Sequence, residues 1–228
     1  MDFKVPGMIT PNPKPWAHRL FQFYLKHSLL KDFHAVYLLT PIPEISNSNA
    51  LILAPNHSSW YDGFIPYFIN QKYFQREFHI LMLEEQLLRF HFFRKLGALG
   101  IRPDQAADIK SGITYMNTIL KPKSLLVYFP QGKIVPDAVP EFQLQQGLRL
   151  LKPQHPTVVL PMRMHIESLN ERKPALFISF GNLIPLDAYR TSPGKLEHAF
   201  YQLKDQESQQ LASASFGNCI YGTPHTGL

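Results

Sequence analysis

The sequence predicts a single α/β domain with a mostly parallel central sheet flanked by helices. Short apolar runs alternate along the chain with segments whose apolar residues have helical spacing, which is typical of this layered architecture. Two of the runs end in polar, turn-forming sequence, as buried parallel strands commonly do. The 228 residues, 45% hydrophobic and 18% charged, are enough for one domain with its own core and too few for two full domains.

The apolar runs that we expect to form strands are residues 50–54, 78–83, 97–101, 124–129 and 176–180, and residues 157–166 are expected to contain a strand around residues 158–160. Between and after them, the spacing of apolar side chains predicts helices over residues 84–96, 106–120, 142–151 and 194–204. We expect these elements to form one domain over residues 46–204. Residues 205–228 are rich in Ser, Gln and Gly, so we expect a flexible tail there.

The N-terminal region, residues 1–45, is expected to be a proline-rich lead followed by an amphipathic helix. Over residues 16–37 a narrow polar strip faces a wide apolar arc rich in aromatic residues. Such a helix can lie in a lipid interface or pack on its own domain, and the pattern fits both. No run reaches the ~18 apolar residues of a spanning helix, and no secretory signal is visible. We therefore expect peripheral attachment to the cytoplasmic face of a membrane.

The charge balance is basic, with 23 Lys and Arg against 17 Asp and Glu, which indicates an anionic partner. Lipid headgroups, phosphorylated substrates and nucleic acid all fit that charge. The basic residues are scattered and no nucleic-acid-binding motif is present, so we expect no nucleic-acid partner. Cys219 is the only cysteine, which excludes a disulfide within the chain and fits a reducing compartment.

His57 and Asp62 are candidates for a catalytic pair because they lie five residues apart, just after an apolar strand. A carboxylate bound to one imidazole nitrogen fixes the tautomer and leaves the other nitrogen free as a base. Backbone N–H groups at the start of the following helix would then be available for a developing oxyanion. By spacing alone, a loop histidine bonded to a helix-capping aspartate explains the pattern at least as well.

Further motifs follow in a fixed order and favour the catalytic interpretation. The ordered set is Asn56-His57-x4-Asp62, then Phe129-Pro130-Gln131-Gly132-Lys133, a helical segment around Gly147, Val159-Leu160-Pro161, and a strand running into Gly181 and Pro185. Over residues 45–190 this set resembles the glycerol-phosphate and lysophospholipid acyltransferases. The resemblance implies the glycerolipid acyltransferase fold, His57 as general base and Asp62 as the group that orients it.

The second motif departs from the pattern of that family. Gln131 replaces a glutamate, and Lys133-Ile134 replaces a Thr-Arg pair whose arginine is implicated in binding the phosphate of the acceptor. A lysine supplies a point charge and lacks the bidentate fork of arginine. The resemblance implies that Gln131, Gly132 and Lys133 shape the acceptor side. Arg102 corresponds imperfectly to a further acceptor-binding arginine, and a solvated residue at a strand end explains it equally well.

The resemblance implies a fatty acyl thioester as donor, carried on coenzyme A or acyl carrier protein, with no metal and no bound cofactor. The acceptor is expected to be a lysophospholipid such as 1-acylglycerol-3-phosphate. A glycolipid, an isoprenoid glycoside or a non-catalytic lipid-binding role are the alternatives. Arg163 and His165 either line the pocket or simply alternate along a strand.

Two other enzyme classes fit the sequence poorly. A metal hydrolase needs three or four converging ligands, and His57, Asp62, His79 and His91 have no recognised ligand spacing. A serine hydrolase of the common type needs a Gly-x-Ser-x-Gly turn, which is absent.

Overall fold

The computed structural model describes residues 8–139 and 141–224 and confirms the predicted α/β fold. Nine strands of this part of the chain form one mixed sheet, in the order β4-β3-β5-β2-β6-β7-β1-β9, with β8 beside β6. The strands are β1 (Ala35–Leu38), β2 (Ala50–Pro55), β3 (Glu77–Leu83), β4 (Ala98–Ile101), β5 (Ser124–Val127), β6 (Thr157–Glu167), β7 (Ala175–Phe180), β8 (Ile184–Pro185) and β9 (Asn218–Gly222). Strands β4, β3, β5, β2 and β6 pair in parallel, as do β7 and β1, whereas the β6–β7, β6–β8 and β1–β9 pairs are antiparallel.

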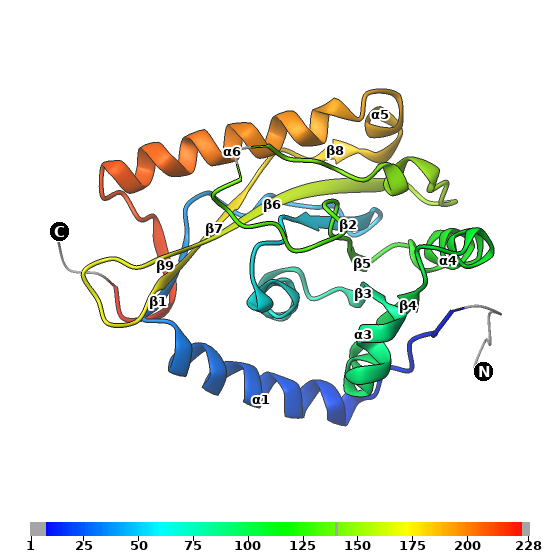
Figure 1. Cartoon of the computed structure of the whole chain (residues 1–228), viewed down its shortest axis with the longest axis horizontal. Coiled ribbons are helices and arrows are strands. Elements are labelled where there is room, and N and C mark those ends of the chain that lie inside the picture. Colours follow the sequence, from blue (N-terminus) through cyan, green and yellow to red (C-terminus); the bar gives the residue numbers. More distant parts are fainter. Residues whose placement is uncertain (1–7, 140, 225–228) are drawn as a thin grey trace.

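Helices cover both faces of the sheet, with α1 along one side and α6 along the other (Figure 1). The α-helices are α1 (Pro15–Asp32), α2 (Ile65–Ile69), α3 (Glu84–Arg89), α4 (Ala106–Ile119), α5 (Leu186–Thr191) and α6 (Gly194–Ala212). The shorter turns are the 3₁₀ helices η1 (Trp60–Gly63), η3 (His91–Leu96) and η4 (Gln146–Leu150) and the π-helical η2 (Asn70–Phe74). The chain thus forms a three-layer arrangement whose central sheet is buried on both faces.

Strand β2 lies in the middle of the sheet and all six of its residues are buried. Leu51 and Leu53 point into the core under α1 and α2, while Ile52 and Ala54 point into the core under α4 and α6. Because successive side chains of a strand point to opposite faces, a continuous apolar run is needed at this position. The carboxyl end of β2 is therefore fixed from both sides, and the functional turn begins there.

Helix α1 has one buried face and one exposed apolar face. Ala17, Phe21 and Leu25 pack into the core, whereas Trp16 and Phe23 are 51% and 64% exposed. Among the described residues, no helix has the length and hydropathy needed to cross a bilayer. The prediction of a helix over residues 16–37 is right to about Asp32, after which the chain turns into β1.

Two predicted helices differ from the structure. The helix expected over residues 84–96 is divided at Phe90, whose backbone leaves the helical region and separates α3 from η3. The helix expected over residues 142–151 is reduced to η4. There, a Cβ on Gly147 would lie 2.3 Å from the Tyr128 hydroxyl, so the backbone of this turn packs closely on the Tyr128 side chain.

The C-terminal region also differs from expectation. Residues 205–212 continue α6, because Leu203 and Glu207 on its inner face are buried against the sheet. Residues 218–222 form β9, which pairs antiparallel with β1. The flexible tail expected from residue 205 is thus replaced by a helix and an edge strand as far as Gly222, and residues 225–228 lie outside the described residues. The polar composition reflects the exposed outer face of a surface helix.

Candidate active site

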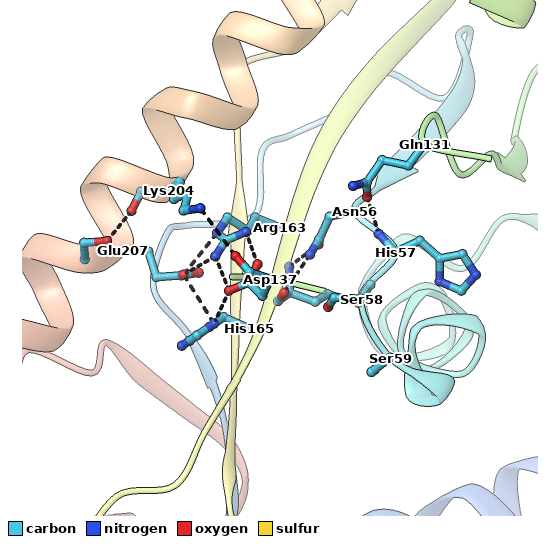
Figure 2. Close-up of polar contacts among 12 residues, drawn as sticks. Asn56, His57, Ser58, Ser59, Gln131, Asp137, Arg163, His165, Lys204 and Glu207 are labelled. Atoms are coloured by element: carbon cyan, nitrogen blue, oxygen red, sulfur yellow. Dashed lines mark hydrogen bonds and ion pairs between the residues drawn. The ribbon is translucent and has the colours of Figure 1, made fainter. Parts of the chain in front are cut away.

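The candidate site lies beyond the carboxyl ends of β2 and β5, two neighbouring parallel strands. The turn after β2 carries His57 and leads into η1, which contains Asp62. The loop after β5 carries Gln131, Gly132 and Lys133. Because adjacent parallel strands end at the same edge of the sheet, two motifs 74 positions apart in sequence are brought into contact, as Figure 2 shows for His57 and Gln131.

His57 and Asp62 form the predicted pair. The imidazole Nδ1 of His57 lies 3.1 Å from the Oδ2 atom of Asp62. The His57 side chain is 22% exposed, whereas the Asp62 side chain is 3% exposed. A carboxylate at Nδ1 favours the tautomer with its proton on that nitrogen, so Nε2 keeps its lone pair. The geometry therefore provides a base with one free nitrogen and a buried carboxylate behind it.

Asp62 is held by its own turn. Its Oδ2 accepts hydrogen bonds from the backbone N–H groups of Ser58 and Ser59 at 2.5 and 2.7 Å. Its Oδ1 accepts the Ser59 hydroxyl at 2.7 Å. These hydrogen bonds compensate for the burial of the Asp62 carboxylate, which would be unfavourable without them. They also change one expectation, since these two N–H groups at the start of η1 are already committed to Asp62 and do not serve an oxyanion.

The main chain of His57 is clamped from both sides. Its N–H donates to the Gln131 side-chain Oε1 at 2.7 Å, and its carbonyl accepts the Val135 N–H at 2.7 Å. One residue earlier, the Asn56 side chain donates to the Met164 carbonyl at 2.9 Å and accepts the Met164 N–H at 2.7 Å. This side chain continues the pairing of β2 with β6 beyond the end of the strand. Sequence analysis had not singled out Asn56 or Val135 for this role.

Gln131, expected on the acceptor side, is 5% exposed and contributes to the frame of the site. An amide oxygen accepts the same bond from His57 N–H that a carboxylate would accept, so the uncharged residue retains the contact. Gly132 follows with a φ of 69°, a backbone conformation that a residue with a side chain rarely adopts. That turn brings Lys133, whose side chain is exposed, to the rim of the site.

A cavity of about 1260 Å³ opens at His57. The His57 ring stacks on Phe129 with centroids 4.4 Å apart, and both residues line the cavity. Its lining is predominantly apolar. It includes side chains from α1, α2, β3, α4 and the segment that follows β5, among them Phe21, Tyr67, Phe78, Ile109, Met116 and Tyr128. Burial raises the pKa of the Tyr128 hydroxyl to about 12, so this group stays neutral. The cavity suits a long apolar ligand with one polar end.

Charged side chains occur at few places on this cavity wall. Among the described residues, Arg89 and Lys133 are the lysine and arginine side chains that line it, and Glu85 is the acid. The two cations give the polar part of the cavity a positive balance, which fits an anionic group on a ligand.

Arg102 is not brought to the cavity. Its Nε donates to Asp108 Oδ2 at 2.5 Å, and Asp108 is buried at the first turn of α4. Its neighbours Ile101 and Pro103 line the cavity, but Arg102 is not among the lining residues. The guanidinium thus ties the end of β4 to α4.

A polar cluster behind the site joins Asp137, Arg163, His165 and Glu207. Sequence analysis gave Arg163 and His165 two readings and did not consider the two acids. They lie on the side of β6 that faces α6, away from the cavity (Figure 2). Arg163 and His165 therefore do not line the cavity.

Comparison with known proteins places this geometry in a family. A family model described as "Acyltransferase" matches residues 35–165, more than half of the chain. The chain is similar in structure to the 1-acyl-sn-glycerophosphate (LPA) acyltransferase PlsC from Thermotoga maritima, with a TM-score of 0.50. The two sequences are 15% identical, and the match covers 85% of this chain and 77% of the other, so it supports the fold alone. None of the curated proteins compared with the sequence matches it. On the strength of the family match over residues 35–165, this chain belongs to the acyltransferase family.

Proposed function

We propose that the protein transfers a fatty acyl group from an acyl thioester to a lipid hydroxyl. The acceptor that fits best is a lysophospholipid such as 1-acylglycerol-3-phosphate. The observation that carries the proposal is the His57–Asp62 pair, 3.1 Å apart, at the mouth of a large apolar cavity. Acyl-CoA or acyl carrier protein would supply the donor as a co-substrate, and the mechanism needs no metal and no bound cofactor.

In the proposed reaction, Nε2 of His57 removes the proton from the acceptor hydroxyl as its oxygen attacks the thioester carbonyl. The tetrahedral intermediate collapses to the ester and expels the thiolate, which takes the proton from His57. Asp62 keeps the imidazole in the required tautomer and stabilises its protonated form between the two steps. The four donors around Asp62 support this role, because a carboxylate held this firmly stays in place when the imidazole is charged.

The acceptor would bind with its acyl chain among the apolar residues and its headgroup at the basic rim. Lys133 and Arg89 are our candidates for the headgroup phosphate, since both line the cavity that opens at His57. Gln131 and Gly132 would act by shaping this loop. The expectation that Arg102 contacts the acceptor stays a prediction, and its pairing with Asp108 weighs against it.

We also propose that the outer face of α1 contacts a lipid surface. Trp16, Leu20, Phe23 and Tyr24 are each about half exposed or more on that face. Lys26 and Arg19 are exposed on the same helix and can meet anionic headgroups. Phe21, on the inner face, lines the cavity, so one helix would connect the bilayer to the site. Peripheral attachment on the cytoplasmic face fits, because coenzyme A and acyl carrier protein thioesters occur there.

The test measures thiol release from palmitoyl-CoA and from palmitoyl acyl carrier protein. The acceptors are lysophosphatidic acid, other lysophospholipids and glycosylated lipids. We expect release that depends on the acceptor and that falls about 10³-fold in His57→Ala, the usual contribution of a general base. His198→Ala, which removes an exposed histidine of α6, is the matched control. Equal activity of His57→Ala and wild type would rule out the mechanism, and a glycolipid as best acceptor would replace the lysophospholipid.

The same assay distinguishes the cations. Lys133→Gln should raise the KM for lysophosphatidic acid about tenfold and leave the KM of an uncharged acceptor unchanged, because one charge-assisted contact is worth ~1.5 kcal/mol or more. Arg102→Gln should change neither KM by more than about twofold, since its partner is Asp108. A raised KM for lysophosphatidic acid in Arg102→Gln, with an unchanged KM in Lys133→Gln, would mean that Arg102 and not Lys133 binds the acceptor.

Membrane contact is tested by sedimentation with vesicles of phosphatidylcholine containing 30% phosphatidylglycerol. The double variant Trp16→Ser/Phe23→Ser should bind at least about tenfold more weakly than wild type, because each exposed aromatic ring contributes roughly 1.5–3 kcal/mol on burial. Tyr73→Ser removes an exposed aromatic ring outside α1 and should bind like wild type. Unchanged binding of the double variant would place the lipid-facing surface elsewhere.

A further inference from the structure

A buried ionic network lies behind the candidate base, on the opposite side of β6 from the cavity. Arg163 is 1% exposed and holds both carboxylate oxygens of Asp137 with two parallel bonds of 2.8 Å. The same guanidinium bonds Glu207 of α6 through Nε at 3.0 Å. His165 adds a contact of 2.7 Å from Nδ1 to Asp137. Figure 2 shows the four side chains converging between β6 and α6.

Three members of this network have the chemistry of metal ligands. Atoms of Asp137, His165 and Glu207 lie within 4.8 Å of one another. However, the Arg163 guanidinium already occupies both oxygens of Asp137 and one of Glu207. A second cation at the same oxygens would be repelled by this buried charge. Arg163 thus takes the place that a metal ion would occupy. The network is better explained as a set of ion pairs that holds a loop in position than as a metal site.

The network fastens the loop that carries the second motif. This loop leaves β5, contributes Gln131 and Lys133 to the site, and passes the His57 carbonyl, to which Val135 N–H donates. Two residues later it reaches Asp137. On one side the loop is therefore bonded to the main chain of His57, and on the other it is bonded to Arg163.

Strand β6 links both fastenings. The main chain of Met164 bonds the Asn56 side chain, next to His57. The residues on either side of Met164 are Arg163 and His165, which point to the other face and hold Asp137. These three residues are consecutive on one strand. The same short segment of β6 therefore holds both the turn that carries His57 and the loop that carries Asp137.

We propose that Asp137 is a positioning residue for acyl transfer, which holds the Gln131–Val135 segment against the His57 main chain through its bonds to Arg163 and His165. The inference rests on the proposed function. Loss of the Asp137 charge would leave Gln131 and Val135 free to separate from His57. A small displacement of the catalytic base lowers the rate of the reaction strongly.

The position of this loop should depend on the charge of His165. The groups that face its imidazole are Asp137 from the loop, Glu207 from α6 at 3.9 Å, and Glu167 and Arg163 from β6. Burial would lower the pKa of His165, and so would the charge of Arg163. The hydrogen bond to Asp137 and the negative charges of Glu207 and Asp137 outweigh both effects, so the pKa of His165 is raised. Burial likewise opposes the charge of Asp137, and the bonds from His165 and Arg163 hold the pKa of that carboxyl well below its usual range.

The cluster carries the least excess of negative charge when His165 is protonated. Arg163 and His165 then face the carboxyl groups of Asp137 and Glu207, and burial raises the pKa of Glu207. When His165 loses its proton, a positive charge beside Asp137 is lost, and among the described residues Glu207 Oε2 has no hydrogen-bond partner. We therefore expect the loop to loosen as the pH rises.

The experiment compares Asp137→Asn with Asp205→Asn, which changes an exposed aspartate of α6. Asp137→Asn should lower kcat roughly tenfold to a hundredfold with little change in the KM for acyl-CoA, and Asp205→Asn should stay within about twofold of wild type. The His165→Gln variant, whose amide can donate to Asp137 at any pH, should lose the decline of kcat/KM that the wild type shows at alkaline pH. Asp137→Asn/His165→Gln should lose no more than Asp137→Asn alone, because both changes act on one contact.

Amide hydrogen exchange gives a readout that does not depend on turnover. Asp137→Asn should speed exchange in peptides covering residues 131–139 and at the amide of His57, whereas peptides from α4 should be unchanged. If Asp137→Asn merely reduces the folded fraction, with normal kcat per folded molecule and unchanged local exchange, the positioning role is refuted. If wild type lacks turnover with every acceptor but the local exchange still increases, the proposed function fails and the fastening of the loop stands.

Discussion

Two segments meet at His57, and they are held in different ways. The turn from His57 to Asp62 is held by contacts within five residues, from His57, Ser58 and Ser59 to one carboxylate. The loop from Gln131 to Asp137 is held by side-chain contacts to residues 26 to 74 positions away. The chemistry is thus encoded locally, whereas its placement against the second motif depends on the whole sheet.

The largest effect should come from breaking the local segment at Asp62. Asp62→Asn replaces an acceptor-only group by an amide, so His57 Nδ1 loses its charged partner and the wrong tautomer is no longer disfavoured. We expect kcat to fall on the order of 10²- to 10⁴-fold, as for other oriented histidines. The same thiol-release assay measures it, with Asp205→Asn as the control.

Asp62→Asn also tests stability. With its NH2 group in the place of Oδ2, the N–H groups of Ser58 and Ser59 would both lose their acceptor. If the side chain flips, its oxygen accepts these two bonds, and the NH2 group takes the place at which the Ser59 hydroxyl now donates. Thermal unfolding should show a loss of about 1–3 kcal/mol. An unchanged kcat would contradict the role of Asp62, whatever the change in stability.

The contrast between the two segments explains what the sequence could predict. Strand β2 was predicted to within about two residues, because it is a continuous apolar run in a sheet buried on both faces. Strand β6 runs to Glu167, beyond the segment around residues 158–160 that was predicted, because polar residues interrupt the apolar pattern of its second half. Strands β1 and β9 were missed, since β1 follows directly on an apolar helix and β9 is a partly exposed edge strand of mixed composition. Strand β1 pairs with β7 and β9, and β9 pairs with β1, and no local sequence pattern records such long-range pairing.

The same limit applies to the site. The spacing of His57 and Asp62 was sufficient to predict their contact, because η1 returns the chain within one turn. Arg102 was a candidate for the acceptor from its position in an imperfect motif, with a solvated strand-end residue as the equal alternative. Its pairing with Asp108, at the start of the next helix, was not predicted. Asp137 and Glu207 were not considered. Asp137 lies only four residues after the second motif, which was an available sign, whereas Glu207 lies in the segment that was expected to be a flexible tail.

An intermediate effect should follow from cutting the bond that joins the two segments. Gln131→Met keeps the size of the side chain but removes the oxygen that accepts the His57 N–H. An unsatisfied buried N–H costs about 1–3 kcal/mol, and we expect kcat to fall about tenfold as the His57 main chain shifts.

Gln131→Glu is the matched variant because it restores an acceptor oxygen. At pH 8 it should keep activity within about threefold of wild type. Equal losses in Gln131→Met and Gln131→Glu would mean that the residue acts by shape and not through this bond.

The smallest effect should come from His165, at the far end of the loop, and it should appear as stability. The pKa of His165 is raised in the folded state above its ordinary value of 6.5. A raised pKa means that the imidazolium contributes its full stabilisation below about pH 6.5 and loses it as the pH rises through the folded-state value. Wild type should therefore exceed His165→Gln in free energy of unfolding by on the order of 1–2 kcal/mol at pH 6, and the difference should shrink toward pH 9. Urea unfolding of both proteins at several pH values measures it. A difference that stays constant with pH would show that His165 acts as a neutral hydrogen-bonding group, and that its charge plays no part in holding the loop.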